Sequence, residues 1–294
     1  NIIILWATCK EHRTMIEITA LNIYPVKSMK GIPQRQARLT RLGLEHDRRW
    51  MVVRENGRFV TQRDLAALAL VHTHMAEDAV VLSRPGCGEI RVPLEGTHGD
   101  TVQTRVWNDD CTTRDEGSEV SAWLTATLES PERLRLVHMA ADFERILGKA
   151  NLMGPDTTTL FADAAPLLVA NESSLERLNR ELTARGLVDV PMNRFRPNIV
   201  VRGLDAFAEH GMASLEGESY RLGLRYPCER CIVPTIDQDS AERNHGWQPY
   251  MTLRDINPMP GNDKAPAFGQ NAVLESGDGR LVRVGDRLLG EAKA

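Results

Sequence analysis

The sequence has few of the features that mark several common classes of protein. Only 5 of its 294 residues are cysteine, an odd number without regular spacing, which indicates a reducing compartment rather than a disulfide framework. The formal net charge is −4, so the chain has no overall attraction to nucleic acid or to an anionic membrane. It also contains no internal repeat or low-complexity tract, and a solenoid is therefore not expected.

Long apolar runs are missing as well. Residues 1–7 are mostly apolar, but no basic residue precedes them and the run is too short to span a bilayer. We therefore expect no stable membrane anchor and a cytoplasmic location, with a membrane-associating tail as the alternative. A strand-like alternation begins at Met15, so we expect residues 1–14 to be a non-native or disordered extension whose deletion leaves the melting temperature unchanged.

The composition is that of a soluble globular protein, with 42% hydrophobic and 26% charged residues, and the length suits one or two domains. In the first half, an Asn56-Gly57 turn between two short runs predicts a β-hairpin. Short strands with frequent turns predict a barrel or a sandwich. A helix is expected over residues 120–128 with Ser118 as its N-cap, and the first module ends near Pro131.

The second half mixes strands with a helix. The predicted strands cover residues 134–137, 166–170, 199–201, 220–226 and 280–289. Residues 171–173 open a helix over residues 174–182, which has an amphipathic pattern. We therefore expect a mainly β fold with some α, made of two β-rich modules at residues 15–130 and 131–291 with helices packed around them.

Two cysteines form the most informative motif, Cys228-x-x-Cys231. A closed zinc site needs four ligands, yet the other cysteines are scattered and His245 has no second histidine nearby. A thioredoxin-type pair draws its low pKa from a helix N-terminus, and the Ile-Val-Pro run at residues 232–234 argues against a helix there. What remains is a thiolate on a strand-to-loop segment, which suits a soft metal centre. Two reduced structural cysteines are the alternative.

Six further motifs accompany this pair in a fixed order. They are YPVKSMKG at 24–31, GLEHDRRW at 43–50, LVANESSL at 168–175, RFRPNIVV at 194–201, FGQN at 268–271 and VGD at 284–286. The ordered set resembles the MOSC family (molybdenum-cofactor sulfurase C-terminal domain), in the branch that includes the amidoxime-reducing components, from about Ile16 to Leu289. The resemblance implies an N-terminal β-barrel domain followed by a MOSC β-barrel domain with flanking helices.

The resemblance also implies a molybdenum cofactor, in which a pyranopterin carries a phosphate and an enedithiolate that holds the metal. The second cysteine of the pair, Cys231, is then the molybdenum ligand and catalytic, and Asp237 has a supporting role. Many relatives carry threonine where this chain has Pro234, which would alter the loop. Cys228 is expected to support the site or to be structural, so Cys231→Ala should abolish activity while Cys228→Ala retains some.

The cofactor-binding residues follow from the motifs and from their chemistry. Basic and amide donors suit phosphate and pterin oxygens, and the N-terminus of a helix favours phosphate. The assigned residues are Lys27, Ser28, Arg48, Asn171, Ser173, Ser174, Arg194, Arg196 and Asn198. Without the resemblance each has a plainer interpretation. Lys27 would be a solvated charge, Asn171 or Ser173 a helix cap, and the arginines members of structural ion pairs.

The activity implied is the reductive removal of oxygen from a small N-hydroxylated substrate, with water as the second product. Asp237, Gln270 and Asn271 are candidates for a proton route, and His46 and His245 are less specific ones. The sequence contains no ferredoxin-like cysteine cluster, so a separate redox protein is expected to supply the electrons. The alternative function is a sulfur carrier with a persulfide on Cys231; a non-catalytic cofactor-binding protein is a third.

Overall fold

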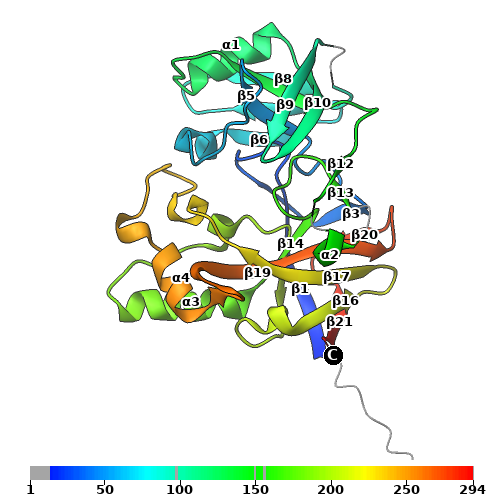
Figure 1. Cartoon of the computed structure of the whole chain (residues 1–294), viewed down its shortest axis with the longest axis vertical. Helices are drawn as coiled ribbons and strands as arrows, with labels where there is room; N and C mark the ends of the chain where they lie inside the picture. Colours follow the sequence, from blue (N-terminus) through cyan, green and yellow to red (C-terminus); the bar gives the residue numbers. More distant parts are fainter. Residues whose placement is uncertain (1–13, 97–98, 149, 155–156, 294) are drawn as a thin grey trace, which may run out of the picture.

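The computed structural model describes residues 14–96, 99–148, 150–154 and 157–293. Strands dominate it, and four α-helices lie among them in the described chain, so the predicted fold class, mainly β with some α, is confirmed. Figure 1 shows an upper module with strands β5 to β10 and helix α1, and a lower module with the longest strands. The prediction of an extension concerns residues 1–13, which lie outside the described residues, and Thr14, which is the first residue of β1.

The lower module is a closed barrel of seven strands. Its order is β14-β15-β1-β21-β16-β17-β19, and β19 pairs with β14 to close it. The bounds are β1 (Thr14–Ile23), β14 (Leu167–Asn171), β15 (Ile199–Arg202), β16 (Met212–Glu216), β17 (Arg221–Glu229), β19 (Asn262–Ser276) and β21 (Arg287–Ala292). Alternate residues of β1, including Ile16 and Ile18, point into the core, as the period of a strand requires.

The upper module is built from two small sheets and one helix. A four-stranded sheet has the order β5-β11-β10-β9, and a three-stranded sheet has the order β6-β7-β8. The bounds are β5 (Trp50–Arg54), β6 (His72–Met75), β7 (Ala79–Ser83), β8 (Glu89–Pro93), β9 (Thr101–Val106), β10 (Asp109–Asp115), β11 (Leu134–Met139) and α1 (Ser118–Thr127). Trp50, Leu82 and Leu124 are fully buried in the core between them. The N-cap of α1 is Gly117 with φ 103°, not Ser118, because glycine alone adopts this backbone angle freely.

The two modules seen in space do not coincide with two consecutive segments of the sequence. The first strand, β1, lies in the barrel between β15 and β21, although residues 50–139 that follow build the upper module. Strand β11 begins after residue 131 and nevertheless pairs with β5 in the upper module. The described part of the chain therefore begins in the barrel, leaves it and returns. The domain bounds expected from the sequence, residues 15–130 and 131–291, remain a prediction.

The remaining elements cover the barrel or connect the modules. They are β2 (Ile32–Gln34), β3 (Gln36–Thr40), β4 (Gly43–Leu44), β12 (Arg145–Ile146), β13 (Thr158–Thr159), β18 (Pro258–Met259), β20 (Leu281–Arg283), α2 (Ala150–Met153), α3 (Glu172–Ala184) and α4 (Tyr250–Ile256). Five short 3-10 helices are η1 (Ala66–Leu70), η2 (Met192–Phe195), η3 (Ala208–Gly211), η4 (Val233–Thr235) and η5 (His245–Trp247). None of the helices described is long and apolar enough to cross a membrane.

Candidate functional site

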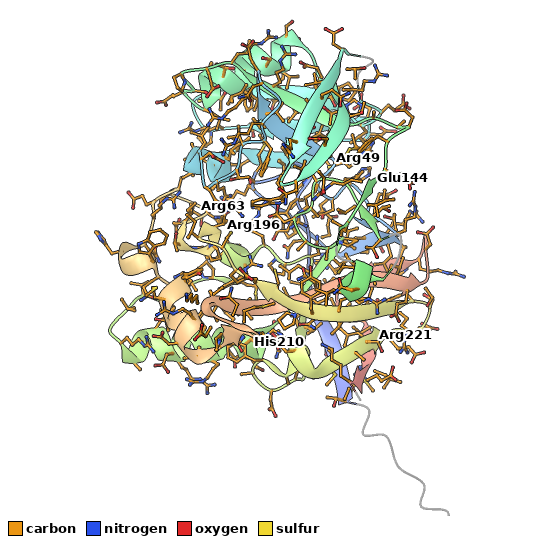
Figure 2. All side chains as sticks on the ribbon, in the orientation of Figure 1. Arg49, Arg63, Glu144, Arg196, His210 and Arg221 are labelled. Atoms are coloured by element: carbon orange, nitrogen blue, oxygen red, sulfur yellow. The ribbon has the colours of Figure 1, made fainter. Side chains whose placement is uncertain are left out.

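A cavity of about 120 Å³ lies where the barrel meets the upper module, and we call it the junction cavity. Its walls come from loops that follow β1, η2 and β17 and from the loop that precedes β5. Eight residues singled out from the sequence line it: Lys27, Ser28, Arg48, Arg196, Asn198, Cys228, Cys231 and Asn271. Figure 2 labels two of its lining side chains, Arg63 and Arg196, at the level where the modules meet.

The charge of the junction cavity is strongly positive. Five basic side chains line it, against the single carboxylate of Asp163. The basic residues are Lys27, Arg48, Arg63, Arg196 and Arg230. Such an excess of positive charge in a partly enclosed space favours an anionic ligand. The cavity therefore has the electrostatics that a phosphate-bearing molecule requires.

Two of these arginines enclose the ring of Tyr24. The guanidinium groups of Arg48 and Arg196 each lie 4.3 Å from the ring centroid. Arg48 is held by the Asp47 carboxylate at 2.5 Å and by the Asn198 amide oxygen at 2.9 Å. Arg196 is less constrained, because its Nη2 is buried without a hydrogen-bond partner among the described residues. Burial lowers the pKa of Arg196 to about 10, so it remains charged at neutral pH.

Asn198 acts on the site through Arg48. Its side-chain oxygen accepts hydrogen bonds from Arg48 and from the backbone N–H of Leu168, and its amide nitrogen donates to the Asn22 carbonyl at 3.2 Å. These three partners leave little capacity for a ligand. Asn198 is therefore a positioning residue for the guanidinium of Arg48.

Lys27 is buried, which rules out the alternative of a solvated loop charge. Its side chain is 5% exposed, and its Nζ donates to the Phe161 carbonyl at 2.7 Å and to Asp163 Oδ1 at 2.5 Å. Burial lowers the pKa of Lys27, while Asp163 opposes that shift. Partial desolvation by itself would raise the pKa of Asp163, whose side chain is about half exposed, but the Lys27 ammonium outweighs this effect and holds the pKa below its usual range. The pair is therefore ionised at neutral pH.

The two thiols stand at the end of β17 and differ in their partners. Cys231 Sγ accepts a hydrogen bond from the backbone N–H of Val233 at 3.5 Å. Cys228 Sγ accepts one from the guanidinium of Arg230 at 3.1 Å. Burial raises the pKa of Cys228, and Arg230 opposes this shift. No α-helix begins after the motif in the described chain; only a three-residue 3-10 turn, η4, follows it. Pro234 fits this turn because it lies at its start, where a backbone N–H is not needed.

Arg194 and Asp237 lie outside the junction cavity and bind each other. Arg194 Nη2 donates to Asp237 Oδ2 at 2.7 Å, and Arg194 Nη1 donates to the Pro234 carbonyl at 3.3 Å. The other Asp237 oxygen accepts the backbone N–H groups of Asp239 and Ser240, each at 2.8 Å. These contacts hold the loop after Cys231 against η2. They match the structural ion pair considered for Arg194, while the supporting role expected for Asp237 stays a prediction.

The predicted phosphate site at the start of α3 already holds a carboxylate of the chain. Asn171 caps the helix by accepting the Ser173 N–H, and it donates to Glu209 at 3.3 Å. Ser174 Oγ lies 2.9 Å from both oxygens of Glu209, whose side chain is fully buried. Burial raises the pKa of Glu209. Asn171, Ser173 and Ser174 do not line the junction cavity, and these contacts favour the helix-cap interpretation.

Three charged residues of the cavity were not assigned from the sequence: Arg63, Asp163 and Arg230. Arg230 lies between the two cysteines, so its position in the motif could have indicated it. Arg63 and Asp163 stand in segments without a recognisable motif, and only the packing of the two modules brings them to the cavity. Among the polar groups proposed for a proton route, Asn271 lines the cavity. Gln270 is buried, and its Oε1 lies 3.0 Å from Nδ1 of His210.

Comparison with known proteins gives a consistent family. A family model described as the MOSC N-terminal beta barrel domain matches residues 15–131, and one described as the MOSC domain matches residues 156–289. The mitochondrial amidoxime-reducing component 1 of Xenopus laevis is 32% identical over 282 residues, which cover 92% of this chain and 80% of that protein. The Homo sapiens protein of the same name is 32% identical over 288 residues, covering 93% and 83%.

A second human protein and a solved structure are also similar. Mitochondrial amidoxime reducing component 2 of Homo sapiens is 31% identical over 244 residues, which cover 81% of this chain and 71% of that protein. The YUAD protein from Bacillus subtilis is 11% identical, with a TM-score of 0.42 over 96% of this chain and 98% of that chain.

Proposed function

We propose, from the premise that this chain belongs to the MOSC family and to its amidoxime-reducing branch, that it is a molybdenum-cofactor-dependent reductase of N-hydroxylated compounds. The observation that carries the proposal is the pairing, in one cavity, of the Cys231 thiol with five basic side chains. A thiol suits a soft metal, and the basic side chains suit a phosphate. Few other ligands need both.

The donor set of the junction cavity fits the cofactor. Arg196 Nη2 and Arg230 Nε are buried donors without a partner among the described residues, and a polar ligand would satisfy them. No group of three or more His, Cys, Asp or Glu that could hold a metal occurs in the described part of the chain, so Cys231 would be one protein ligand to a metal whose other ligands come with the cofactor. The cavity of about 120 Å³ is smaller than usual ligand sites, so the cofactor would extend beyond it or displace side chains.

Each residue then has a defined task. Arg48, Arg196 and Arg230 would hold the anionic end of the cofactor, Asn198 would orient Arg48, and Cys231 would bind the metal. The cofactor supplies the two-electron chemistry when it is bound. The overall reaction takes up two electrons and two protons for each N–O bond broken, and it yields the reduced nitrogen compound and water. Asn271 lines the cavity and is a candidate polar group on the proton route.

The substrate and the electron donor are proposed from the family. The substrate would be a small molecule, and a separate electron-transfer protein would supply the electrons. The relatives named above are called mitochondrial, whereas a cytoplasmic location stays a prediction for this chain.

The experiment that tests the function measures molybdenum content and pterin fluorescence of protein made in a host that synthesises the cofactor. We expect about one molybdenum atom per chain in the wild type and none in Cys231→Ala, since the metal loses its protein ligand. Cys228→Ala should keep part of the metal and of the benzamidoxime reduction driven by a reduced viologen dye. Cys87→Ala, which removes an exposed cysteine of the upper module, is the matched control and should behave as the wild type.

Two results would contradict the proposal. Equal metal content in Cys231→Ala and the wild type would remove Cys231 as the ligand. Absence of molybdenum from the wild type, together with a persulfide on Cys231, would favour the sulfur carrier instead.

A further inference from the structure

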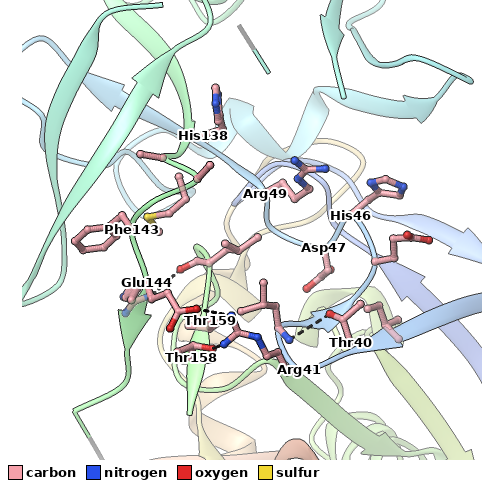
Figure 3. A pocket seen from close by; sticks show the side chains of 18 of the residues that line it. Thr40, Arg41, His46, Asp47, Arg49, His138, Phe143, Glu144, Thr158 and Thr159 are labelled. Carbon is pink, nitrogen blue, oxygen red and sulfur yellow. Dashed lines mark hydrogen bonds and ion pairs between the residues drawn. The ribbon is translucent and has the colours of Figure 1, made fainter. Parts of the chain in front are cut away.

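A second and larger cavity lies on the other side of the loop that carries Arg48, and we call it the loop cavity. Its volume is about 410 Å³, within the range of small-molecule sites, and none of its lining residues lines the junction cavity. Figure 3 shows that its labelled side chains come from the segment 40–49, from the end of β11 and the segment that follows it, and from β13.

The wall between the two cavities is made of two chain segments that lie side by side. His46, Asp47 and Arg49 line the loop cavity, whereas Arg48 between them lines the junction cavity. In the second segment, neighbouring residues also face different cavities: Leu160 lines the loop cavity and Phe161 lines the junction cavity. The backbone N–H of Phe161 donates to the Arg48 carbonyl at 3.1 Å and joins the segments. The cavities are therefore separate but adjacent.

Arg49 is the cation of the loop cavity that remains available to a ligand. Arg41 pairs with Glu144 and donates to Thr158, and Arg145 pairs with Asp109 at 2.8 Å. Arg49 makes no hydrogen bond or ion pair with any residue that the structure describes; it lies over the Trp50 ring at 5.3 Å. Burial lowers the pKa of Arg49, and Glu116 and Glu45 oppose this shift. The guanidinium thus keeps its charge and its fork of N–H donors free.

His46 provides a second group without a partner. Its Nδ1 is buried and makes no hydrogen bond within the described residues. Burial lowers the pKa of His46; the Glu45 carboxylate opposes this shift and the Arg49 charge adds to it. The imidazole ring is therefore neutral at pH 7. Figure 3 shows His46 and Arg49 on one side of the cavity and Phe143 on the other. A buried nitrogen without a partner is uncommon in folded proteins and is satisfied when a polar ligand binds.

The rest of the lining decides the kind of ligand. Met139, Phe143 and Leu160 supply apolar surface. The carboxylates beside them are mostly paired, because Asp47 binds Arg48, Glu144 binds Arg41 and Glu45 lies 3.6 Å from Arg38. Glu95 is the exception and is exposed. These carboxylates would repel a ligand with two negative charges more strongly than a ligand with one.

We propose that the loop cavity binds a small monocarboxylate with an apolar or aromatic body, whose carboxylate pairs with the Arg49 guanidinium and whose body lies against Phe143 and Met139. Arg49 is suited to this because a planar guanidinium matches a carboxylate with two parallel hydrogen bonds. The site is distinct from the junction cavity and does not depend on the function proposed for it.

The test uses benzoate as the probe and benzamide as its uncharged counterpart of the same shape, with affinities from isothermal titration calorimetry on the full chain. We expect the wild type to bind benzoate at least about tenfold more tightly than benzamide. Arg49→Gln should abolish this preference, and Arg49→Lys should keep part of it, since lysine retains the charge without the planar fork. Arg196→Gln, in the junction cavity, and Arg177→Gln, on the exposed face of α3, should retain the full preference.

Three results would overturn the proposal. They are equal affinity of the wild type for benzoate and benzamide, a preference that persists in a cooperatively folded Arg49→Gln, and a preference lost in Arg196→Gln, which would place the anion in the junction cavity. None of these readouts needs molybdenum, so the outcome is independent of the cofactor proposal.

Discussion

At the scale of single residues, the site depends on charges that are held in place by other charges. Lys27 and Asp163 illustrate this, because they come from distant segments and meet at the junction cavity at 2.5 Å. Trp107 Nε1 also donates to Asp163 at 3.0 Å, so this carboxylate links the upper module to the loop after β1. Its side chain is 53% exposed, and solvent screening therefore limits what the pair contributes to stability.

The pH dependence of this pair has a definite sign. Since the folded pKa of Asp163 is lowered, its contribution to the unfolding free energy is present above the unfolded pKa of about 4 and is lost as the pH falls through the folded pKa. We expect Asp163→Asn to be less stable than the wild type in urea unfolding at neutral pH, and the difference to shrink as the pH falls below about 4. A difference that grew under acid conditions would contradict this account. Asp239→Asn, which removes a carboxylate that is 73% exposed and pairs with Lys30, serves as the control.

At the scale of elements, the start of α3 shows how one geometry serves two purposes. The free N–H groups and the dipole of a helix N-terminus attract anions, and the sequence could not tell a bound phosphate from an internal carboxylate. The chain places Glu209 there, on η3, and surrounds it with Asn171 and Ser174. The helix end is thereby anchored to the neighbouring 3-10 turn.

Substitution of each of the two serines at this helix end distinguishes phosphate binding from the structural contact with Glu209. We expect Ser174→Ala to lower the unfolding free energy by about 1–3 kcal/mol, because the buried Glu209 loses a hydrogen bond. Ser173→Ala is the matched control with a small effect, since the recorded bond of Ser173 is made by its backbone. Molybdenum content per folded chain should be unchanged in both variants. Loss of metal without loss of stability in Ser174→Ala would instead restore the phosphate role of this helix end.

At the scale of the whole molecule, the first strand belongs to the barrel although it precedes the upper module in the sequence. Strand β1 pairs with β15 on one side and with β21 on the other. Four of its side chains are buried in the barrel: Ile16, Ile18, Leu21 and Ile23. Burial of four such side chains contributes roughly 6–12 kcal/mol, which is comparable to the whole net stability of a typical domain.

A truncated chain tests this dependence. We expect residues 131–294 alone not to unfold cooperatively by circular dichroism, because β15 and β21 become open edges and the barrel core loses one wall. The strand β11 at its start would also lack its partner β5. Residues 14–294 should melt cooperatively as the control. A cooperative transition of the shorter fragment would show that β1 is dispensable for the barrel.

Local patterns were sufficient for much of the secondary structure. The helix predicted over residues 174–182 is present as α3, and the runs at 199–201 and 220–226 are strands β15 and β17. These segments have the apolar spacing of their element and a turn residue at the end. The limits were less accurate, as at α1, where Gly117 rather than Ser118 caps the helix. A cap depends on backbone angles that neighbouring contacts select, and a pattern of residue types does not contain them.

The sequence by itself determined the fold class and the family, and it supplied candidates for binding a metal and an anion. Residue type, periodicity and the order of motifs are properties of the chain alone, so these inferences needed no coordinates. The tertiary structure decided which of the candidates meet: Lys27, Arg48, Arg196 and Cys231 share one cavity, while Arg194 pairs with Asp237 outside it. It also decided that Arg48 and Arg49 face different cavities. The physical reason is that charge and burial depend on distances between segments far apart in the chain, which only packing sets.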